Sequence, residues 1–285
     1  MAARFDLKVF FEVAAKPVAA VSAADVLGFI TAQRTGARCL PEPGVRAAPT
    51  DPVGVCSRTI RRRLSTVSGL YAFLAVRGDV PTNPVPRGLP TRREQGRPGQ
   101  GVPLVRAPCR TLPRILTPAD VDALTGALRT QRDRAMVAAM VLGALRRCEV
   151  LGLRLGDVNA GERRLFINEG KGGSQRLVPI SPRFFEHLAA YLDQERPADA
   201  DTDALFLVLK RPRRGQPLTA YGIDQVMDDA RARAGLAHAS CHELRHTCLT
   251  RLREAGMPLE AVQAQAGHAS IESTRIYLHL ADDWL

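Results

Sequence analysis

The chain has 285 residues, and 45% of them are hydrophobic, which is enough to fill two ordinary cores. Its formal net charge of +11 favours an acidic partner. No hydrophobic run is long enough to span a bilayer, and the first residues lack a secretory pattern, so the sequence excludes a membrane protein and predicts a cytoplasmic one. The six cysteines have no paired spacing, so we expect reduced thiols.

The excess of positive charge is concentrated at the amino-terminal end. Residues 1–113 hold 17 Lys and Arg against 7 Asp and Glu, whereas residues 114–285 hold 23 against 22. A solvated surface can be basic without binding anything. An excess confined in this way is more typical of a surface that contacts a phosphate backbone. We therefore expect the first part of the chain to bind nucleic acid.

The first part of the chain is predicted to be helical. Apolar residues recur at helical spacing near the start, and a second apolar helix begins after Ser22, which is a good N-cap residue. A loop rich in Pro and Gly over residues 41–54 precedes a long amphipathic helix, predicted from Ser57 to Arg77 and capped by Gly78. The residues expected inside these helices are Phe5, Val9, Phe10, Val26, Phe29, Ile30, Ile60, Leu64, Val67, Leu70, Tyr71 and Leu74.

Four arginines crowd the opening turns of that long helix, namely Arg58, Arg61, Arg62 and Arg63. The positive end of the helix dipole disfavours cations there, so helix stability does not explain them. One interpretation is a solvated charged face, and the other is contact with a DNA backbone or groove. We favour DNA contact for all four.

A linker is predicted to follow. From Asn83 to Pro113 the sequence is dense in Pro, Gly and Arg and has no periodic apolar pattern. We therefore divide the chain into a helical domain over residues 1–90, a basic linker over 91–112 and a second domain over 113–285. The linker should cross DNA as a basic strap.

The second domain is predicted to be mostly helical with a small sheet. Thr117, Pro118 and Asp120 open it with a cap, an N1 proline and an early carboxylate in the preferred order. Residues 163–168 and 175–180 have the pattern of two strands joined by a glycine-rich turn. Further helices are predicted up to Leu145, through Leu153, from Ser181, and over residues 219–234.

Polar side chains suited to chemistry on a phosphodiester gather near the end of the chain. His242 and Arg245 are three residues apart, so on a helix both project from one face toward a common target. A guanidinium neutralises a phosphodiester and forks onto two of its oxygens. The elements expected here are a helix that stops at Gly256, a helix over 258–266 that ends at Gly267 and His268, and a helix from about Ser270 that carries Tyr277.

Three other residues carry groups suited to the same chemistry, but each also has an ordinary structural explanation. Arg146 stands at the end of an apolar helix, where a cation would in any case complement the dipole. Lys171 stands in a polar turn, an ordinary place for a solvated lysine, yet the chain has only four lysines among forty Lys and Arg residues. An ammonium can donate a proton to a leaving 5′ oxygen, whereas a guanidinium hardly can. Tyr277 could merely pack with its hydroxyl in water.

Three stretches together resemble the tyrosine recombinases, the phage-integrase and Xer-type family. Residues 242–279 read His-x-Leu-Arg-His-Thr and then Gly-His-x-Ser-Ile-x-Ser-Thr-x-x-Tyr-x-His, like the catalytic end of the family. Residues 143–153 with Asp157 resemble the segment that holds its first catalytic arginine, and residues 170–180 are similar to the hairpin that holds its catalytic lysine. The resemblance implies the tyrosine recombinase fold, which is mainly α: a helical, SAM-like core-binding domain and a mostly helical catalytic domain with a small β-sheet.

The activity that the resemblance implies is site-specific recombination through a covalent 3′-phosphotyrosyl intermediate. Tyr277 would be the nucleophile, Arg146 and Arg245 would hold the non-bridging oxygens, and Lys171 would protonate the departing oxygen. The implied catalytic set is Arg146, Lys171, His242, Arg245, His268 and Tyr277.

The histidines of the pattern would have different tasks. His242 and His268 would position the phosphate and share proton transfer with the nucleophile. His246 and His279 belong to the family pattern too, and we expect supporting or structural roles for them.

The resemblance also implies the partners. A phosphotyrosine keeps the energy of the ester, so rejoining would need no ATP, no metal and no other cofactor. The partners would be double-stranded DNA with a specific recombination site and three further subunits, in a homo- or hetero-tetramer on two duplexes. The chain ends eight residues after Tyr277 and begins close to the first apolar pattern, so we expect a short or absent terminal helix at each end.

Residues 242–246 also spell His-Glu-x-x-His, the helical zinc site of metalloproteases. Leu249 and Leu252 stand where a metzincin would continue with glycine and histidine, although Glu260 or Glu272 could supply a third ligand. A zinc protease would leave the other motifs without roles. Zinc held by the cysteines and histidines of residues 241–248 is a weaker idea, since one continuous helix cannot easily close a tetrahedron. A DNA-binding module without activity is the remaining alternative.

Overall fold

The computed structural model describes residues 2–36, 54–86, 104–105, 113–168, 175–268 and 270–277. The chain divides into two compact units, Met1–Arg110 and Thr111–Leu285. The predicted linker over 91–112 lies almost wholly outside the described residues, so its strap role stays a prediction.

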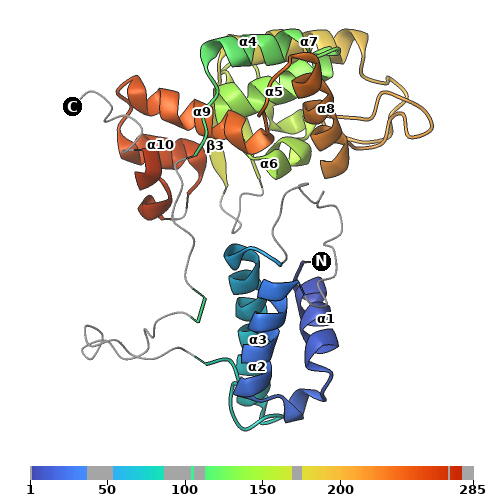
Figure 1. Ribbon diagram of the computed structural model, residues 1–285. Helices are drawn as coiled ribbons and strands as arrows, with labels where there is room; N and C mark the ends of the chain where they lie inside the picture. The colour runs from blue at the N-terminus through green and yellow to red at the C-terminus, as the bar shows by residue number, and fades with distance from the viewer. Residues whose placement is uncertain are drawn as a thin grey trace. The chain divides into compact units, whose positions relative to one another are not determined.

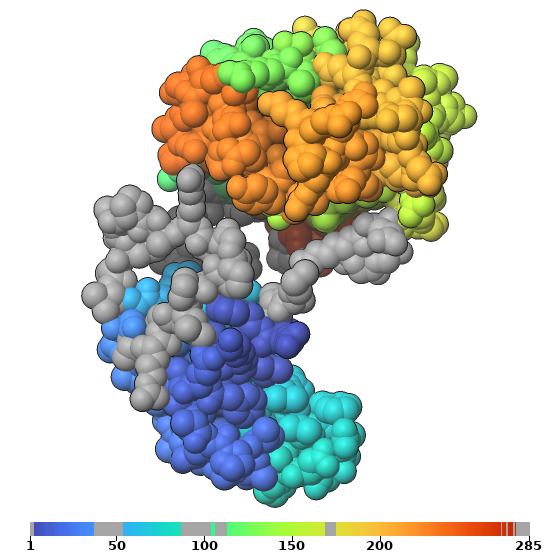
Figure 2. Space-filling view, turned by 90° about the vertical axis from the view of Figure 1, so that its right-hand side faces the viewer, coloured from blue at the N-terminus to red at the C-terminus, as the bar shows by residue number. Residues whose placement is uncertain are grey.

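The first unit is built from the three helices that the apolar pattern predicts. They are α1 (Ala2–Ala14), α2 (Ala23–Thr35) and α3 (Ser57–Arg77), with a 3-10 turn at Val18–Ala20 (Figure 1). Ser22 forms a capping box with Asp25 at the start of α2. The core is made by Val9, Phe10, Val26, Phe29, Ile30, Ile60, Leu64, Val67 and Tyr71, all buried. In the space-filling view the described atoms of this unit, in blue to cyan, form one continuous body (Figure 2).

One of the four arginines of α3 is not on the surface. Arg63 lies one turn after Ile60 on the core-facing side of the helix and is 0% exposed. Its guanidinium donates to the side-chain oxygen of Gln33, lies 3.8 Å from the Asp6 carboxylate, and sits 5.8 Å from the Phe5 ring centre. The expectation that Arg63 contacts DNA is therefore wrong, because its side chain holds α3 against α1 and α2.

The other three arginines remain available at the surface. Arg58, Arg61 and Arg62 are exposed, and Arg62 donates a 2.9 Å hydrogen bond to Asp6. Their placement leaves both interpretations open for these three residues, a solvated face or a DNA contact.

The second unit is organised around a helix with no polar face. Helix α5 (Gln131–Gly143) carries an unbroken apolar run from Ala135 to Val141, all of it buried. It packs against α7 (Pro182–Gln194) and α9 (Cys241–Glu254) (Figure 1). Two further helices of this unit are α4 (Pro118–Gly126) and α8 (Ala220–Arg233).

A small antiparallel sheet stands beside these helices. Its strands run in the order β1 (Val158–Asn159), β2 (Arg164–Ile167) and β3 (Arg176–Pro179), and Leu165 pairs with Val178 across β2 and β3. The two predicted strands are confirmed within a residue at each end, while the two-residue β1 was not predicted. The turn between β2 and β3, with Lys171, lies outside the described residues.

The last segment differs from the predicted helix. After α10 (Leu259–Ala266), two 3-10 turns, Ile271–Ser273 and Arg275–Tyr277, take the place of a helix from Ser270. Residues three apart in a 3-10 turn lie on the same side. This geometry turns both Thr274 and Tyr277 inward, and both are buried.

No helix among the described residues combines the length and apolar character needed to cross a membrane.

The buried position of Arg63 predicts a large effect on the first unit. Arg63→Ala would leave the Asp6 carboxylate with less compensation, and breaking a buried ion pair costs about 3 kcal/mol or more. Hydrogen exchange of the full chain should show that loss in the opening free energy of α3. The matched change Arg61→Ala, at an exposed position, should cost no more than about 0.5 kcal/mol. Equal losses in the two variants would contradict the packing role.

Candidate active site

Five of the six predicted catalytic residues come together from separate segments. Arg146, His242 and Arg245 line one open pocket of about 440 Å³ between α6 (Arg147–Gly152), α8 and α9. His268 and Tyr277 reach the same place from the segment after α10, through the contacts described below. Lys171 lies outside the described residues, so its position stays a prediction.

Arg146 occupies a different position from the predicted one. Helix α5 ends at Gly143, because Ala144 takes a left-handed conformation with φ of 56°, and Arg146 is then the N-cap of α6. Its cation is therefore not at the carboxyl end of α5, where a helix dipole would have explained it. Glu149 compensates it instead: the backbone N–H of Arg146 donates to Oε2 at 2.8 Å, and Nη1 donates to Oε1 at 2.7 Å. Nη2 donates to the Gly267 carbonyl at 3.0 Å.

Glu149 also binds a cation that the sequence analysis passed over. Arg176, the first residue of β3, donates to both carboxylate oxygens of Glu149 at 2.9 and 2.8 Å and to the Gln265 carbonyl at 3.2 Å. Burial works to raise the pKa of the Glu149 carboxyl, but the hydrogen bonds from Arg176 and the Arg146 backbone outweigh it and lower the pKa. The Arg176 guanidinium packs closely against the backbone of Gly267. A Cβ added at that glycine would lie 2.7 Å from the guanidinium.

Arg245 is held deep in the pocket. It donates to the Ala144 carbonyl through Nη1 and to the Ala266 carbonyl through Nη2 at 2.6 Å, and Nη2 lies 3.2 Å from His268 Nε2. Glu149 stands 3.9 Å away. Burial lowers the pKa of Arg245 to about 10, so the side chain stays charged at neutral pH.

The Tyr277 phenol points into this group of cations. It is 1% exposed, its hydroxyl oxygen lies 2.6 Å from His246 Nδ1, and its ring lies nearly parallel to the His268 ring at 6.5 Å between centres. Burial raises the pKa of Tyr277 to about 12, although Arg245 and Arg146 act in the opposite direction. The phenol is therefore protonated at neutral pH and needs a base to become a nucleophile.

Three imidazoles belong to the site: His246 and His268 lie beside the phenol, and His242 lies next to His246. His246 Nε2 lies 2.9 Å from His242 Nε2, and His268 Nδ1 lies 2.9 Å from the Thr274 hydroxyl. Burial lowers the pKa of His246 and of His268 to about 4, and neighbouring cations such as Arg245 add to the effect. Burial lowers the pKa of His242 as well. All three imidazoles are therefore neutral at pH 7.

Comparison with known proteins decides the family. The model of the phage integrase family matches residues 114–283. The chain is 33% identical over 274 residues to tyrosine recombinase XerD of Mycobacterium tuberculosis. The matched stretch covers 91% of this chain and 78% of that protein. The chain belongs to the phage integrase family. It is also 32% identical over 235 residues to tyrosine recombinase XerC of Roseiflexus sp., covering 79% of this chain and 69% of that protein.

The fold of this tyrosine recombinase matches solved relatives. The XerH site-specific recombinase bound to a palindromic difH substrate, a post-cleavage complex, superposes with a TM-score of 0.69 at 19% identity, over 97% of this chain and 75% of that one. A lambda integrase dimer bound to a COC′ core site gives 0.65 at 15% identity, over 99% and 88%. The predicted mainly helical recombinase fold is confirmed.

The arrangement of possible ligands tests the alternative zinc sites. Among the described residues, no three His, Cys, Asp or Glu side chains are arranged to hold a metal ion. His242 and His246 instead turn their Nε2 atoms toward each other, and Cys248 is buried in an apolar cluster with Leu249, Val262 and the Tyr277 ring. Within the part of the chain that the structure describes, the His-Glu-x-x-His spelling therefore has no third metal ligand.

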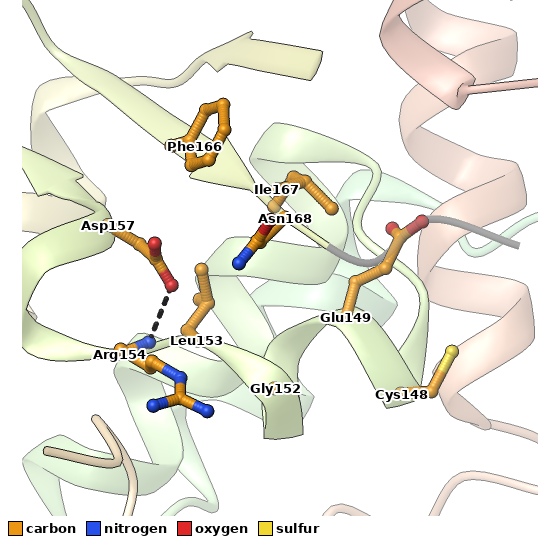
Figure 3. A pocket seen from close by; sticks show the side chains of 9 residues that line it. All are labelled: Cys148, Glu149, Gly152, Leu153, Arg154, Asp157, Phe166, Ile167 and Asn168. Carbon is orange, nitrogen blue, oxygen red and sulfur yellow. Dashed lines mark hydrogen bonds between the residues drawn. The ribbon is translucent and has the colours of Figure 1, made fainter. Parts of the chain in front are cut away.

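The two acidic residues of the arginine motif, Glu149 and Asp157, both line a second pocket but have different contacts. It measures about 220 Å³ and lies between α6 and β2 (Figure 3). Asp157 borders it and accepts a 2.8 Å hydrogen bond from the Arg154 backbone N–H, which stabilises a short turn. Glu149, on the other side in Figure 3, is the acidic residue that reaches the arginines.

Two residues of the site are not among the predicted catalytic residues. Arg176 follows the glycine-rich turn, and an arginine that starts a strand beside that turn is a signal in the sequence that could have identified it. His246 stands one helical turn after His242, and that spacing alone places both imidazoles on one face of α9.

The half-buried imidazoles of His246 and His268 predict a loss of stability in acid. His246 and His268 have lowered pKa values in the folded protein, so between about pH 6.5 and 4 the unfolded chain binds more protons than the folded one. Stability is then complete above about pH 6.5 and falls as the pH drops toward 4. The melting temperature of the second unit should decrease from pH 7.5 to pH 5.

A matched pair of variants tests the cause of that decrease. His268→Gln removes one half-buried imidazole and should shrink the acid-dependent decrease in melting temperature, whereas His238→Gln, at an exposed position, should leave the decrease unchanged. An equal decrease in the parent and in the His268→Gln protein would show that half-buried imidazoles are not responsible.

Proposed function

We propose that this recombinase cuts and rejoins DNA strands at a specific site through a covalent 3′-phosphotyrosyl intermediate formed at Tyr277. The observation that carries the proposal is the position of the phenol, which lies 2.6 Å from His246 Nδ1 and beside His268, in the same site as the guanidiniums of Arg146 and Arg245. A phosphodiester placed in the pocket beside them would be neutralised at the site of attack.

The cationic residues have complementary tasks in this proposal. Arg146 and Arg245 bind the non-bridging oxygens and stabilise the pentavalent state. Attack by Tyr277 forms the Oη–P bond and breaks the bond to the 5′ oxygen, which takes a proton from an acid; Lys171 is the residue proposed for that task. His242 and His268 position the phosphate, and His268 braces Arg245 at 3.2 Å.

The division of labour between the two units is also proposed. The region 113–285 carries the catalytic residues, and the helical region 1–90 binds the core DNA through its exposed arginines Arg58, Arg61 and Arg62. The partners are double-stranded DNA with a recombination site and further subunits, in a homo- or hetero-tetramer on two duplexes. Such a substrate sets the place of action in the cytoplasm.

Removal of the phenolic oxygen of Tyr277 tests whether this residue is the nucleophile. Tyr277→Phe should abolish the covalent adduct on a denaturing gel, while gel-shift binding to the same DNA should persist. Tyr221→Phe removes an equivalent hydroxyl from a side chain that is 77% exposed, and it should leave adduct formation intact. Adduct that persists in the Tyr277→Phe protein would place the nucleophile elsewhere, and a parent protein that binds DNA without any adduct would indicate a binding module without activity.

The mechanism also predicts independence from divalent metals. Protein charges, rather than an ion, neutralise the phosphate in this site, and the phosphotyrosine conserves the ester bond. Cleavage of a cognate site should proceed at the same rate with EDTA as with magnesium. A strict requirement for a divalent ion would contradict the proposal.

A further inference from the structure

His246 is the residue in contact with the nucleophilic oxygen. Its Nδ1 lies 2.6 Å from the Tyr277 hydroxyl, which is the distance of a strong hydrogen bond. From the sequence, His242 and His268 were expected to share proton transfer with the nucleophile, and His246 to have a supporting role. The contact at the phenol instead makes His246 the first residue able to take its proton.

His268 is occupied with other partners. Its Nε2 lies 3.2 Å from the Arg245 guanidinium, and its Nδ1 lies 2.9 Å from the Thr274 hydroxyl. Its ring lies parallel to the phenol ring, 6.5 Å away between centres, so it presents a face rather than a nitrogen to Tyr277. This geometry suits a residue that orients Arg245 and packs against the nucleophile.

The three groups Tyr277, His246 and His242 form a chain from the interior to solvent. His246 Nε2 lies 2.9 Å from His242 Nε2, on the side of the ring away from the phenol. The phenol is buried, His246 is half-buried, and His242 is exposed at the rim of the pocket. A proton that leaves the phenol thus has a continuous hydrogen-bonded route outward.

The tautomers follow from the distances. Two ring nitrogens 2.9 Å apart can share a hydrogen bond only if one of them carries a proton. If Nδ1 of His246 accepts from the phenol, its own proton is on Nε2, and this N–H donates to His242 Nε2. His242 then carries its proton on Nδ1, where it remains a donor for a phosphate oxygen or water.

We propose that His246 is a catalytic residue of strand cleavage, which takes the proton of Tyr277 and relays a proton to His242. As the Oη–P bond forms, the Oη–H bond breaks and its proton moves to His246 Nδ1. The proton on His246 Nε2 moves to His242 Nε2, so one positive charge arises at the rim of the pocket. The same steps run backward when the strand is rejoined. This inference rests on the proposed function.

The electrostatics of the site suit such a relay. The groups that face His246 are His242 and Arg245 on α9, His268 after α10, and Tyr277. Burial and these cations keep His246 neutral and able to accept a proton. A bound phosphodiester would add a negative charge that favours the protonated imidazole, so DNA itself would strengthen the base when it is needed.

The first test is a single-turnover measurement on the full chain. The substrate is a nicked DNA that traps the phosphotyrosyl adduct, used at saturating protein. His246→Asn keeps an amide oxygen near the position of Nδ1, so it can hold the phenol but cannot take a proton. It should slow adduct formation by about 100-fold without weakening DNA binding. His187→Asn, which removes a half-buried imidazole outside the site, should not slow it.

The second test separates proton transfer from packing. A fluorinated tyrosine at position 277 has a lower pKa and needs less help from a base, so the rate loss caused by His246→Asn should become smaller. Raising the pH should also accelerate the His246→Asn protein by about tenfold per unit, as the phenol ionises without help, and the parent much less. A purely structural role would leave both comparisons unchanged.

The outcomes are distinguishable from failure of the proposed function. A parent protein that forms the Tyr277 adduct, together with a His246→Asn protein that forms it at the same rate, would overturn the relay alone. A slow His246→Asn protein whose deficit is insensitive to fluorination and pH would also overturn it. Absence of adduct in the parent would instead overturn the proposed function.

Discussion

The site depends on one buried carboxylate that holds mutually repelling cations together. Glu149 is fully buried and accepts hydrogen bonds from both Arg146 and Arg176, with Arg245 at 3.9 Å. Three guanidiniums so close would otherwise repel one another, and an unpaired carboxylate at this depth would be costly. The carboxylate therefore reduces the repulsion among the guanidiniums, and the guanidiniums reduce the cost of burying the carboxylate. The net positive charge that remains is what a phosphodiester requires.

Backbone carbonyls at the ends of two helices also help to neutralise the arginines of the site. Ala144 and Gly267 take left-handed conformations, with φ of 56° and 60°, at the carboxyl ends of α5 and α10. Their carbonyls and that of Ala266 accept hydrogen bonds from Arg245 or Arg146. The negative ends of two helix dipoles thus face the cations. These carbonyls fix the guanidinium planes before any substrate arrives, which reduces the reorganisation needed in the transition state.

Burial of the phenol explains how the proposed nucleophile can stay inactive. Desolvation keeps Tyr277 protonated, and the nearby guanidiniums favour the phenolate. The balance between these effects changes when a phosphate enters, because the cations then gain a partner and the imidazoles become better bases. Reactivity would therefore appear only with DNA in place.

Sequence by itself determined the elements and most members of the site. Apolar periodicity and caps predicted α3, α8 and the β2–β3 hairpin, because local spacing decides these elements. Only the tertiary structure decided that Arg63 is buried while its neighbours are exposed, that Arg146 caps α6, and that His246 rather than His268 contacts the Tyr277 hydroxyl. Those outcomes depend on which residues distant in the chain are packed opposite each side chain, and a one-dimensional pattern does not contain that information.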